Sequence, residues 1–234
     1  MTAVYRKELL IYFTSPIVYA YLLVFYFFSG LGFNAICIAQ QTNNLTGAID
    51  YMFTISMFIL PVLTMRLFGE ERKNKTDILL YTSPAGTFGI VAGKLLAAAT
   101  VYGVASAIFV VYAFVIGLFT AVQWAVFFCG LLGFLLMGVS LIAIGGFISV
   151  LTENQIVAAV ITFAISLLLS LMDYIASMVS GIAKTVLEYL SYNTHFTPFQ
   201  TGQIGLSHII FFLSVTGLFA FFTARSIDHR RFSA

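Results

Sequence analysis

The spacing of charged residues is the feature that most constrains how this chain of 234 residues can fold. Four long stretches contain no charged residue: Leu9–Ile49, Leu95–Thr152, Asn154–Met172 and Tyr189–Ala224. Charged residues make up only 9% of the chain, and hydrophobic residues make up 61%. A soluble domain is about 25% charged, so these charges are too few to cover a water-soluble surface. The pattern predicts an integral membrane protein and excludes a disordered chain.

A membrane-spanning helix needs about 20 apolar residues, so the stretch from Leu95 to Thr152 is long enough for two crossings. The turn between them is predicted near Gly117–Trp124, where polar and aromatic residues suit an interface. The whole pattern predicts an all-α fold, a single membrane domain over 1–234 with six transmembrane helices. The spans are placed at about 17–39, 49–68, 87–118, 123–151, 155–174 and 206–225. A short interfacial helix is predicted at 4–13.

The positive charges predict the orientation of the six spans. Of the 11 Lys and Arg residues, only Lys184 falls on the side opposite to the termini. Because Lys and Arg gather in cytoplasmic loops, both termini and loop 69–85 are predicted to be cytoplasmic. Segments 40–48 and 175–205 are then external. The net charge of +2 is too small for a nucleic-acid-binding surface, so no nucleic-acid partner is predicted.

Several charged residues are predicted to lie at the cytoplasmic membrane interface. They are Arg6, Lys7, Glu8, Lys94 and Glu153. Lys94 comes near the start of the third span, and its long side chain is expected to extend to the interface. Cys37 and Cys129 fall inside spans and are expected to be buried free thiols.

Small residues and a proline predict where helices pack closely. Gly89 and Gly93 are four residues apart in the third span, and Gly138 belongs to a series of glycines in the fourth. Pro61 is expected to kink the second span and to free a carbonyl. In the external segment 175–205, apolar residues recur at helical spacing from Ile175 to Leu190, which predicts an amphipathic helix on the outer face.

Three motifs that could suggest catalysis or nucleotide binding fail on the spacing or depth of their residues. The run from Gly89 to Lys94 has three residues between its glycines, whereas a phosphate-binding loop has four. It also has Leu after the lysine, where that loop has Ser or Thr. Ser140 and His208 could suggest an intramembrane serine protease. However, Ser140 is predicted to lie about 25 Å from the outer surface and His208 close to it. No metal-binding spacing joins the three histidines.

The cytoplasmic segment after the second span has six charged residues within positions 70–77, in a chain that is otherwise almost uncharged. Pairs of opposite charge four residues apart favour a short helix. Apolar residues follow at once, so this segment is predicted to be a helix, 70–81, that docks a cytosolic partner. The expected contact residues are Glu70, Glu71, Arg72, Lys73, Asp77, Ile78, Leu79 and Tyr81.

Three segments around this loop resemble the ABC-2 type permeases. They are Met65–Arg72, Leu79–Pro84 and Ile90–Leu96. Leu151–Ala158 and Asn193–Gly202 are also similar to the gliding-motility-associated branch of that family. The resemblance extends over nearly the whole chain. Asp77 departs from the family pattern, in which Thr or Glu is common.

The resemblance implies one half of the membrane domain of an ABC exporter, with the type V exporter fold. Two such subunits, identical or paralogous, would form a twelve-helix unit in a bacterial inner membrane. Separate ATPase subunits would bind ATP and magnesium, so this chain would need no cofactor and would not be an enzyme. Loop 70–81 would be the coupling helix. The alternative is a membrane scaffold that docks a cytosolic protein without transport.

Overall fold

A computed structural model describes residues 2–73 and 86–231, and within these residues it contains helices and no strand. The helices before residue 74 are α1 (Thr2–Thr14), α2 (Pro16–Phe33), the π-helix η1 (Asn34–Ile38), α3 (Leu45–Thr64) and α4 (Arg66–Lys73). Those after residue 85 are α6 (Thr87–Ser106), α7 (Ile108–Gly117), α8 (Trp124–Leu151), α9 (Gln155–Met178), α10 (Ile182–Leu190), α11 (Tyr192–Gln200) and α12 (Leu206–Arg231).

Six helical segments of the described residues are long and apolar enough to cross a membrane, which confirms the predicted all-α polytopic fold. They run over Pro16–Ile38, Leu45–Glu70, Thr87–Gly117, Trp124–Leu151, Gln155–Met178 and Leu206–His229. The fifth and sixth continue four residues beyond the predicted ends at 174 and 225. The reason is that Asp173 and Arg225, which limit the apolar stretches, do not interrupt the helices.

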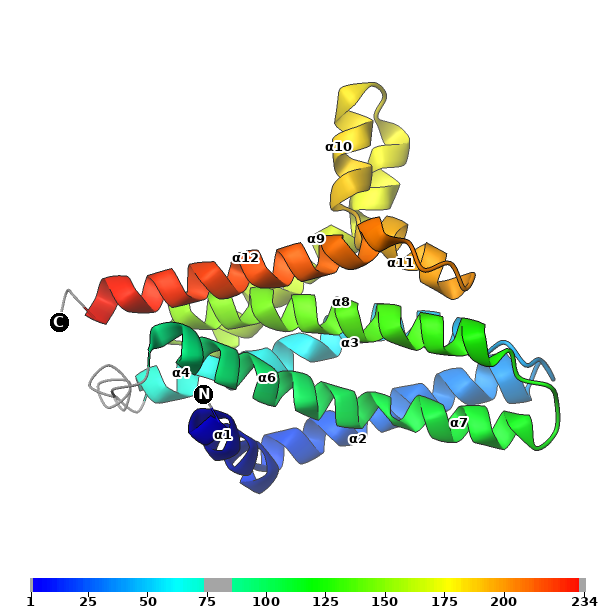
Figure 1. Ribbon diagram of the computed structural model, residues 1–234, viewed down its shortest axis with the longest axis horizontal. Coiled ribbons are helices and arrows are strands. Elements are labelled where there is room, and N and C mark those ends of the chain that lie inside the picture. The colour runs from blue at the N-terminus through cyan, green and yellow to red at the C-terminus, as the bar shows by residue number, and fades with distance from the viewer. Residues whose placement is uncertain (1, 74–85, 232–234) are drawn as a thin grey trace.

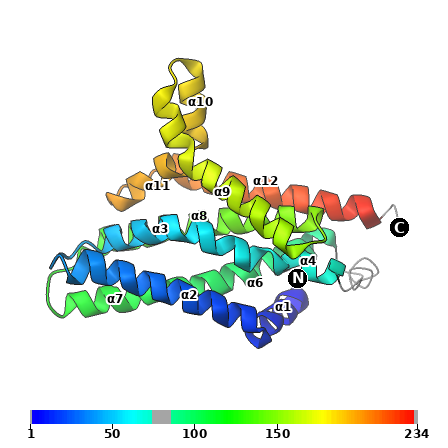
Figure 2. The same cartoon turned by 180° about the vertical axis from the view of Figure 1, so that it is seen from behind.

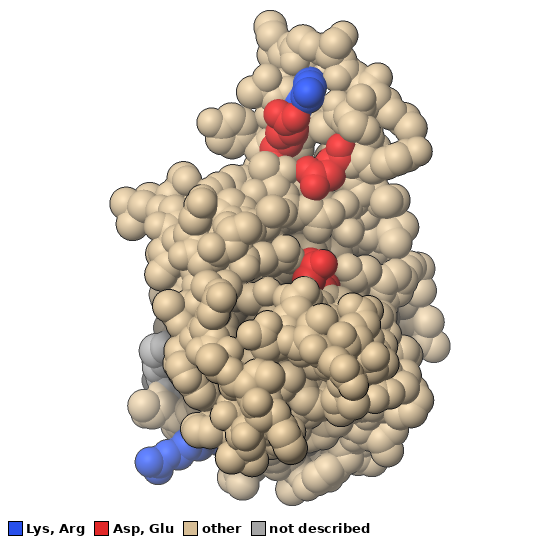
Figure 3. Space-filling view, turned by 90° about the vertical axis from the view of Figure 1, so that its right-hand side faces the viewer, with Lys and Arg blue, Asp and Glu red and all other residues tan. Residues whose placement is uncertain are grey.

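The helices form an elongated bundle with both termini at one end, here called the terminal end (Figures 1 and 2). The α7–α8 connection lies at the opposite end, here called the loop end. Helix α8 is the centre of the bundle and packs against α12, α3, α11 and α6. Figure 3 looks onto the loop end, and most of this surface carries no charged side chain.

Glycines let α8 occupy this central position. A Cβ atom at Gly133 would lie 2.7 Å from the Phe199 ring of α11. One at Gly138 would overlap the Tyr102 ring of α6. Gly89 does not behave as predicted among the described residues, because none of their atoms lies within 4 Å of its Cβ position.

Replacing Gly138 with alanine should destabilise the bundle. The added methyl group would force the fully buried Tyr102 ring to move, and Tyr102 donates a hydrogen bond of 2.9 Å to the Phe134 carbonyl. Overpacking of this kind costs about 1–3 kcal/mol. Gly103→Ala is the matched control, because nothing lies within 4 Å of its Cβ position. Thermal unfolding in detergent should show a lower midpoint for Gly138→Ala alone; equal midpoints would contradict this packing.

Segment 175–205, which the sequence predicts to be external, differs from the single amphipathic helix predicted from its periodicity. Helix α9 continues to Met178, and α10 begins only at Ile182. Gly181 between them has a φ of +79°, a conformation that favours glycine and lets the chain turn. The two helices pack against each other, and α10 projects from the bundle together with the C-terminal end of α9 (Figure 1). The apolar residues therefore lie on two helices rather than on one face.

Pro61 lies inside α3, where it is buried. Its carbonyl accepts from the Met65 N–H at 3.0 Å and from the Thr64 hydroxyl at 3.2 Å. The helix ends at Thr64, and α4 starts again at Arg66. The break in the second span thus comes four residues after the proline, at the terminal end.

Candidate functional site

The segment predicted to dock a partner begins in the described part of the chain. Helix α4 starts at Arg66, four residues before the predicted coupling helix, and it includes Glu70, Glu71, Arg72 and Lys73. The remaining predicted contact residues, Asp77, Ile78, Leu79 and Tyr81, lie outside the described residues. The described part of the site therefore consists of α4 and the helices that contact it.

Lys94 does not extend to the interface as predicted. Its side chain is only 1% exposed, and its ammonium group lies 3.0 Å from the carboxylate of Glu8. The same ammonium donates to the Leu67 carbonyl at 2.8 Å and lies 5.2 Å from the centre of the Phe68 ring. Glu8 is also buried, so its carboxylate faces Lys94 rather than solvent. The pair joins α1 and α6 to the first turn of α4.

The predicted interfacial helix is present as α1, but it packs against α6 through a specific close contact. A Cβ atom at Gly93 would lie 3.2 Å from Val4 and 3.3 Å from the backbone nitrogen of Tyr5. The Tyr5 hydroxyl is 3.0 Å from that of Thr100. Because Gly93 has no side chain, α1 approaches closely enough for Glu8 to reach Lys94. Arg6, Lys7 and Glu153 are exposed.

Arg66 forms a second connection between α4 and the start of α2. Its guanidinium binds the carboxylate of Glu70 one turn later, with an Nε–oxygen distance of 2.8 Å. It also donates to the Ser15 hydroxyl, and that hydroxyl caps α2 by accepting from the Ile17 N–H at 3.3 Å. A movement of α4 would therefore pull directly on the N-terminus of the first span.

Ser149 of α8 caps the start of α4 from a distant part of the chain. Its hydroxyl accepts from the N–H groups of Phe68 and Gly69 at 3.1 and 3.0 Å, and it donates to the Met65 carbonyl at 3.1 Å. The first N–H groups of a helix have no partner within that helix, so a capping side chain is needed. Ser149 is completely buried, and it couples α4 to the central helix of the bundle.

We call these residues, Glu8, Ser15, Arg66, Glu70, Lys94 and Ser149, the α4 junction. Sequence reasoning found Glu8, Glu70 and Lys94 as separate residues of the interface and the loop. It missed Ser15, Arg66 and Ser149 as parts of one site. Arg66 and Glu70 are four residues apart, a signal that the i,i+4 pattern could have revealed. No local pattern marks Ser149, because its partners lie 80 to 84 residues away.

Ser140 and His208, which the sequence argues against as a protease pair, do not face each other in the structure. The Ser140 hydroxyl donates to the Met137 carbonyl at 2.7 Å and lies 2.9 Å from the Tyr192 hydroxyl. His208 instead faces His195, with 2.9 Å between their Nδ1 atoms. Both histidines thus have partners other than Ser140, and Ser140 joins α8 to α11. No group of three or more metal-ligating side chains occurs in the part of the chain that the structure describes.

The pairing of His195 with His208 fastens segment 175–205 to α12. His195 Nε2 lies 3.1 Å from the Tyr189 carbonyl of α10, and its ring stacks on Phe211 of α12 at 3.9 Å. Because a carbonyl only accepts, Nε2 carries the hydrogen and Nδ1 accepts from His208. Burial lowers the pKa of His195, the bond to the Tyr189 carbonyl partly offsets this, and His208 lowers it further.

Acidification should therefore weaken the outer segment. Since the pKa of His195 is lowered in the folded protein, the unfolded state binds the proton more readily, and stability is lost as pH falls below the ordinary value of 6.5. We expect the unfolding midpoint to fall from pH 7.5 to pH 5 in the wild type and to fall less in His195→Gln/His208→Gln. His229→Gln, an exposed histidine at the terminal end, is the control. Equal pH dependence in all three proteins would contradict this assignment.

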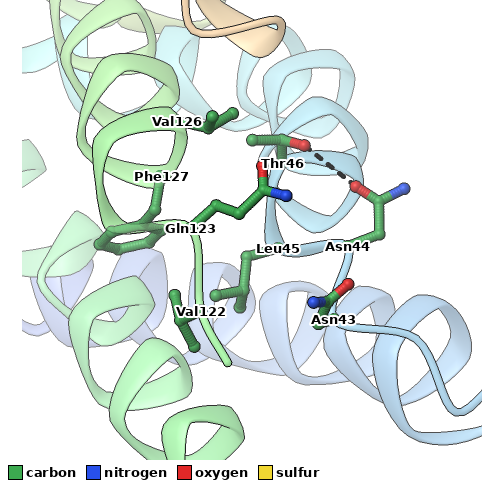
Figure 4. Close-up of a pocket in the computed structure, with 8 residues that line it drawn as sticks. All are labelled: Asn43, Asn44, Leu45, Thr46, Val122, Gln123, Val126 and Phe127. Carbon is green, nitrogen blue, oxygen red and sulfur yellow. Dashed lines mark hydrogen bonds between the residues drawn. The ribbon is translucent and has the colours of Figure 1, made fainter. Parts of the chain in front are cut away.

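A pocket of about 180 Å³ at the loop end lies between the starts of α3 and α8 (Figure 4). The carboxamide oxygen of Asn44 accepts from the Gly47 N–H and from the Thr46 hydroxyl, both at 3.0 Å. The carboxamide of Asn43 donates to the Ala121 carbonyl at 3.1 Å. These polar groups hold two turns together, so we assign the pocket a structural role.

A bundle with six helical segments of membrane length in its described residues is that of a polytopic membrane protein. Residues 38–224 match the family of ABC-2 family transporter proteins, which is most of the chain. The chain belongs to this family. It is a membrane component of an ABC transporter, of the kind that is itself generally not catalytic. Comparison with curated proteins gives no match.

Proposed function

We propose that this chain is the permease subunit of an ABC exporter and that ATPase subunits drive it through α4 and the segment that follows. The observation that carries the proposal is the α4 junction. The ammonium of Lys94 and the hydroxyl of Ser149 both hold the first turn of α4, so a force on α4 reaches α1, α6 and α8 together. Elements joined by such contacts move between discrete packed states.

In the proposed division of labour, nucleotide binding belongs to the partner subunits. Lys94, the lysine of the loop-like sequence, is bound to Glu8 and to the Leu67 carbonyl, which supports a structural role for it. ATP and magnesium would be bound by the ATPase subunits. A second copy or a paralogue would complete a twelve-helix unit in a bacterial inner membrane. The motifs at 151–158 and 193–202 favour the gliding-motility-associated branch.

Co-purification tests the proposal against the scaffold alternative. The chain would be expressed with a candidate ABC ATPase subunit from the same genome and captured through a tag on the chain. We expect the ATPase to co-purify and its ATP hydrolysis to change when the complex enters a bilayer. A scaffold would bind a partner that hydrolyses no ATP, and that result would contradict the permease assignment.

Labelling of single cysteines tests the proposed orientation. In a background without Cys37 and Cys129, we expect a cysteine at Asn44 or Thr194 to react with an impermeant thiol reagent added outside the cell. The physical reason is the concentration of Lys and Arg on the side of the termini. A cysteine at Asn74 should react only after the membrane is opened. Outside labelling of Asn74 would invert the orientation.

A further inference from the structure

A groove between α8 and α12 opens at the terminal end of the bundle, and the α4 junction does not use it. The groove is open along one side, and its volume is about 480 Å³. The two helices lie side by side along the bundle (Figures 1 and 2). The groove is lined by Phe147, Leu151, Phe222, Arg225, Ser226 and His229.

The floor of the groove is aromatic. The Phe147 ring lies 5.9 Å from that of Phe222 and 5.8 Å from that of Phe219. Phe222 is 42% exposed, and Leu151, at the end of α8, is 51% exposed. Within a bilayer these side chains would face hydrocarbon rather than water, and such a surface suits an acyl chain.

The mouth of the groove is basic. Arg225 and His229 are exposed and lie one helical turn apart, on the same face of α12, with Ser226 beside them. None of the described residues that line the groove is acidic. Asp228, the nearby acid of α12, is bound to the Thr87 hydroxyl of α6. An arginine at such a site binds a phosphate through two parallel hydrogen bonds.

The depth of Arg225 matches the position of a lipid phosphate. Arg225 lies 19 residues after Leu206, the first residue of α12. At 1.5 Å per residue this is about 28 Å, close to the hydrocarbon thickness of about 30 Å. If α12 begins at one edge of the hydrocarbon, the guanidinium lies at the other edge, where headgroups start.

We propose that this groove binds one anionic phospholipid, with its phosphate on Arg225 and Ser226 and an acyl chain along Phe147 and Phe222. The basic mouth selects the anionic headgroup, and the aromatic floor selects a lipid over free phosphate. Binding would fasten α12 to α8 at the end of the bundle where Asp228 connects α12 to α6. This inference does not depend on transport activity.

Native mass spectrometry of the purified chain can count bound lipids. The delipidated protein would be titrated with phosphatidylglycerol, with phosphatidylcholine and with inorganic phosphate. We expect one phosphatidylglycerol to bind at concentrations at which phosphatidylcholine does not, and inorganic phosphate not to displace it. Equal binding of the two lipids, or displacement by phosphate, would overturn the proposal.

Matched variants locate the lipid. Arg225→Gln removes a charge-assisted contact and should weaken binding about tenfold or more. Lys184→Gln, a half-exposed cation outside the spans, should leave it unchanged. Phe147→Ala should weaken binding, whereas Phe128→Ala, an exposed phenylalanine near the other end of α8, should not. Unchanged binding in Arg225→Gln, with its unfolding midpoint retained, would overturn the proposal. A disulfide between two copies through Ser226→Cys would also overturn it, because the groove would then be a subunit interface.

Discussion

Replacing Lys94 with methionine should destabilise the folded protein by about 3–5 kcal/mol, because the carboxylate of Glu8 would remain buried without its partner. The Leu67 carbonyl would also lose its donor. We expect a strongly lowered unfolding midpoint in detergent and, in a complex with the ATPase, a loss of coupled activity. This is one of the two largest effects that the structure predicts.

Two controls separate the buried pair from a general effect of charge. Lys184→Met removes a pair whose side chains are about half exposed and 3.7 Å apart, and such a pair contributes only about 0–1 kcal/mol. The double variant Lys94→Met/Glu8→Leu replaces both charges with apolar groups and should recover much of the lost stability. If Lys94→Met were as mild as Lys184→Met, the junction would not hold α4.

Truncating Leu79 and Tyr81 together to alanine should release the ATPase during purification. Exposed ion pairs contribute little, so binding strength should come from buried apolar anchors. The loss of two anchors should weaken binding by about a hundredfold or more. The measurement is the amount of ATPase that co-purifies with the tagged chain. Leu118→Ala/Phe119→Ala, two residues more than 80% exposed at the loop end, is the control pair.

The charged residues of the same segment should act differently. Reversing the charge of Glu71 or Arg72 should uncouple ATP hydrolysis from transport, because rim charges set orientation and partner choice more than affinity. The membrane domain should remain folded. If the ATPase stays bound and coupled after both the truncations and the charge reversals, the segment is only a turn and the partner docks elsewhere.

The six spans could be predicted because charge is excluded from the hydrocarbon, a constraint that each stretch of sequence carries by itself. The α4 junction depends instead on contacts between distant segments. Glu8 and Lys94 are 86 residues apart, and the same lysine read alone suggests an interfacial side chain. Gly89 and Gly93 look equivalent in the sequence, yet of the two only Gly93 comes within 4 Å of the described residues of α1. The face of a helix that contacts a neighbour depends on how all the helices of the bundle are arranged.

The structure of segment 175–205 also could not be predicted from local sequence patterns alone. Its apolar periodicity from Ile175 to Leu190 is real, but Gly181 turns the chain between two helices. The apolar residues keep the same spacing on both sides of the turn, so the sequence alone does not reveal the turn. His195 and His208 are 13 residues apart and belong to different helices, so no motif announces their contact. The turn at Gly181 and the contact between the two histidines become evident only in the three-dimensional structure.

The central claim is that the segment beginning with α4 is where ATPase subunits act on this permease. The most direct measurement is photo-crosslinking in cells, with a photoreactive amino acid in place of Tyr81 and, separately, of Leu118 at the loop end. The account predicts an adduct with an ABC ATPase subunit from position 81 and none from position 118. No ATPase adduct from position 81, with the chain expressed and inserted, would contradict it.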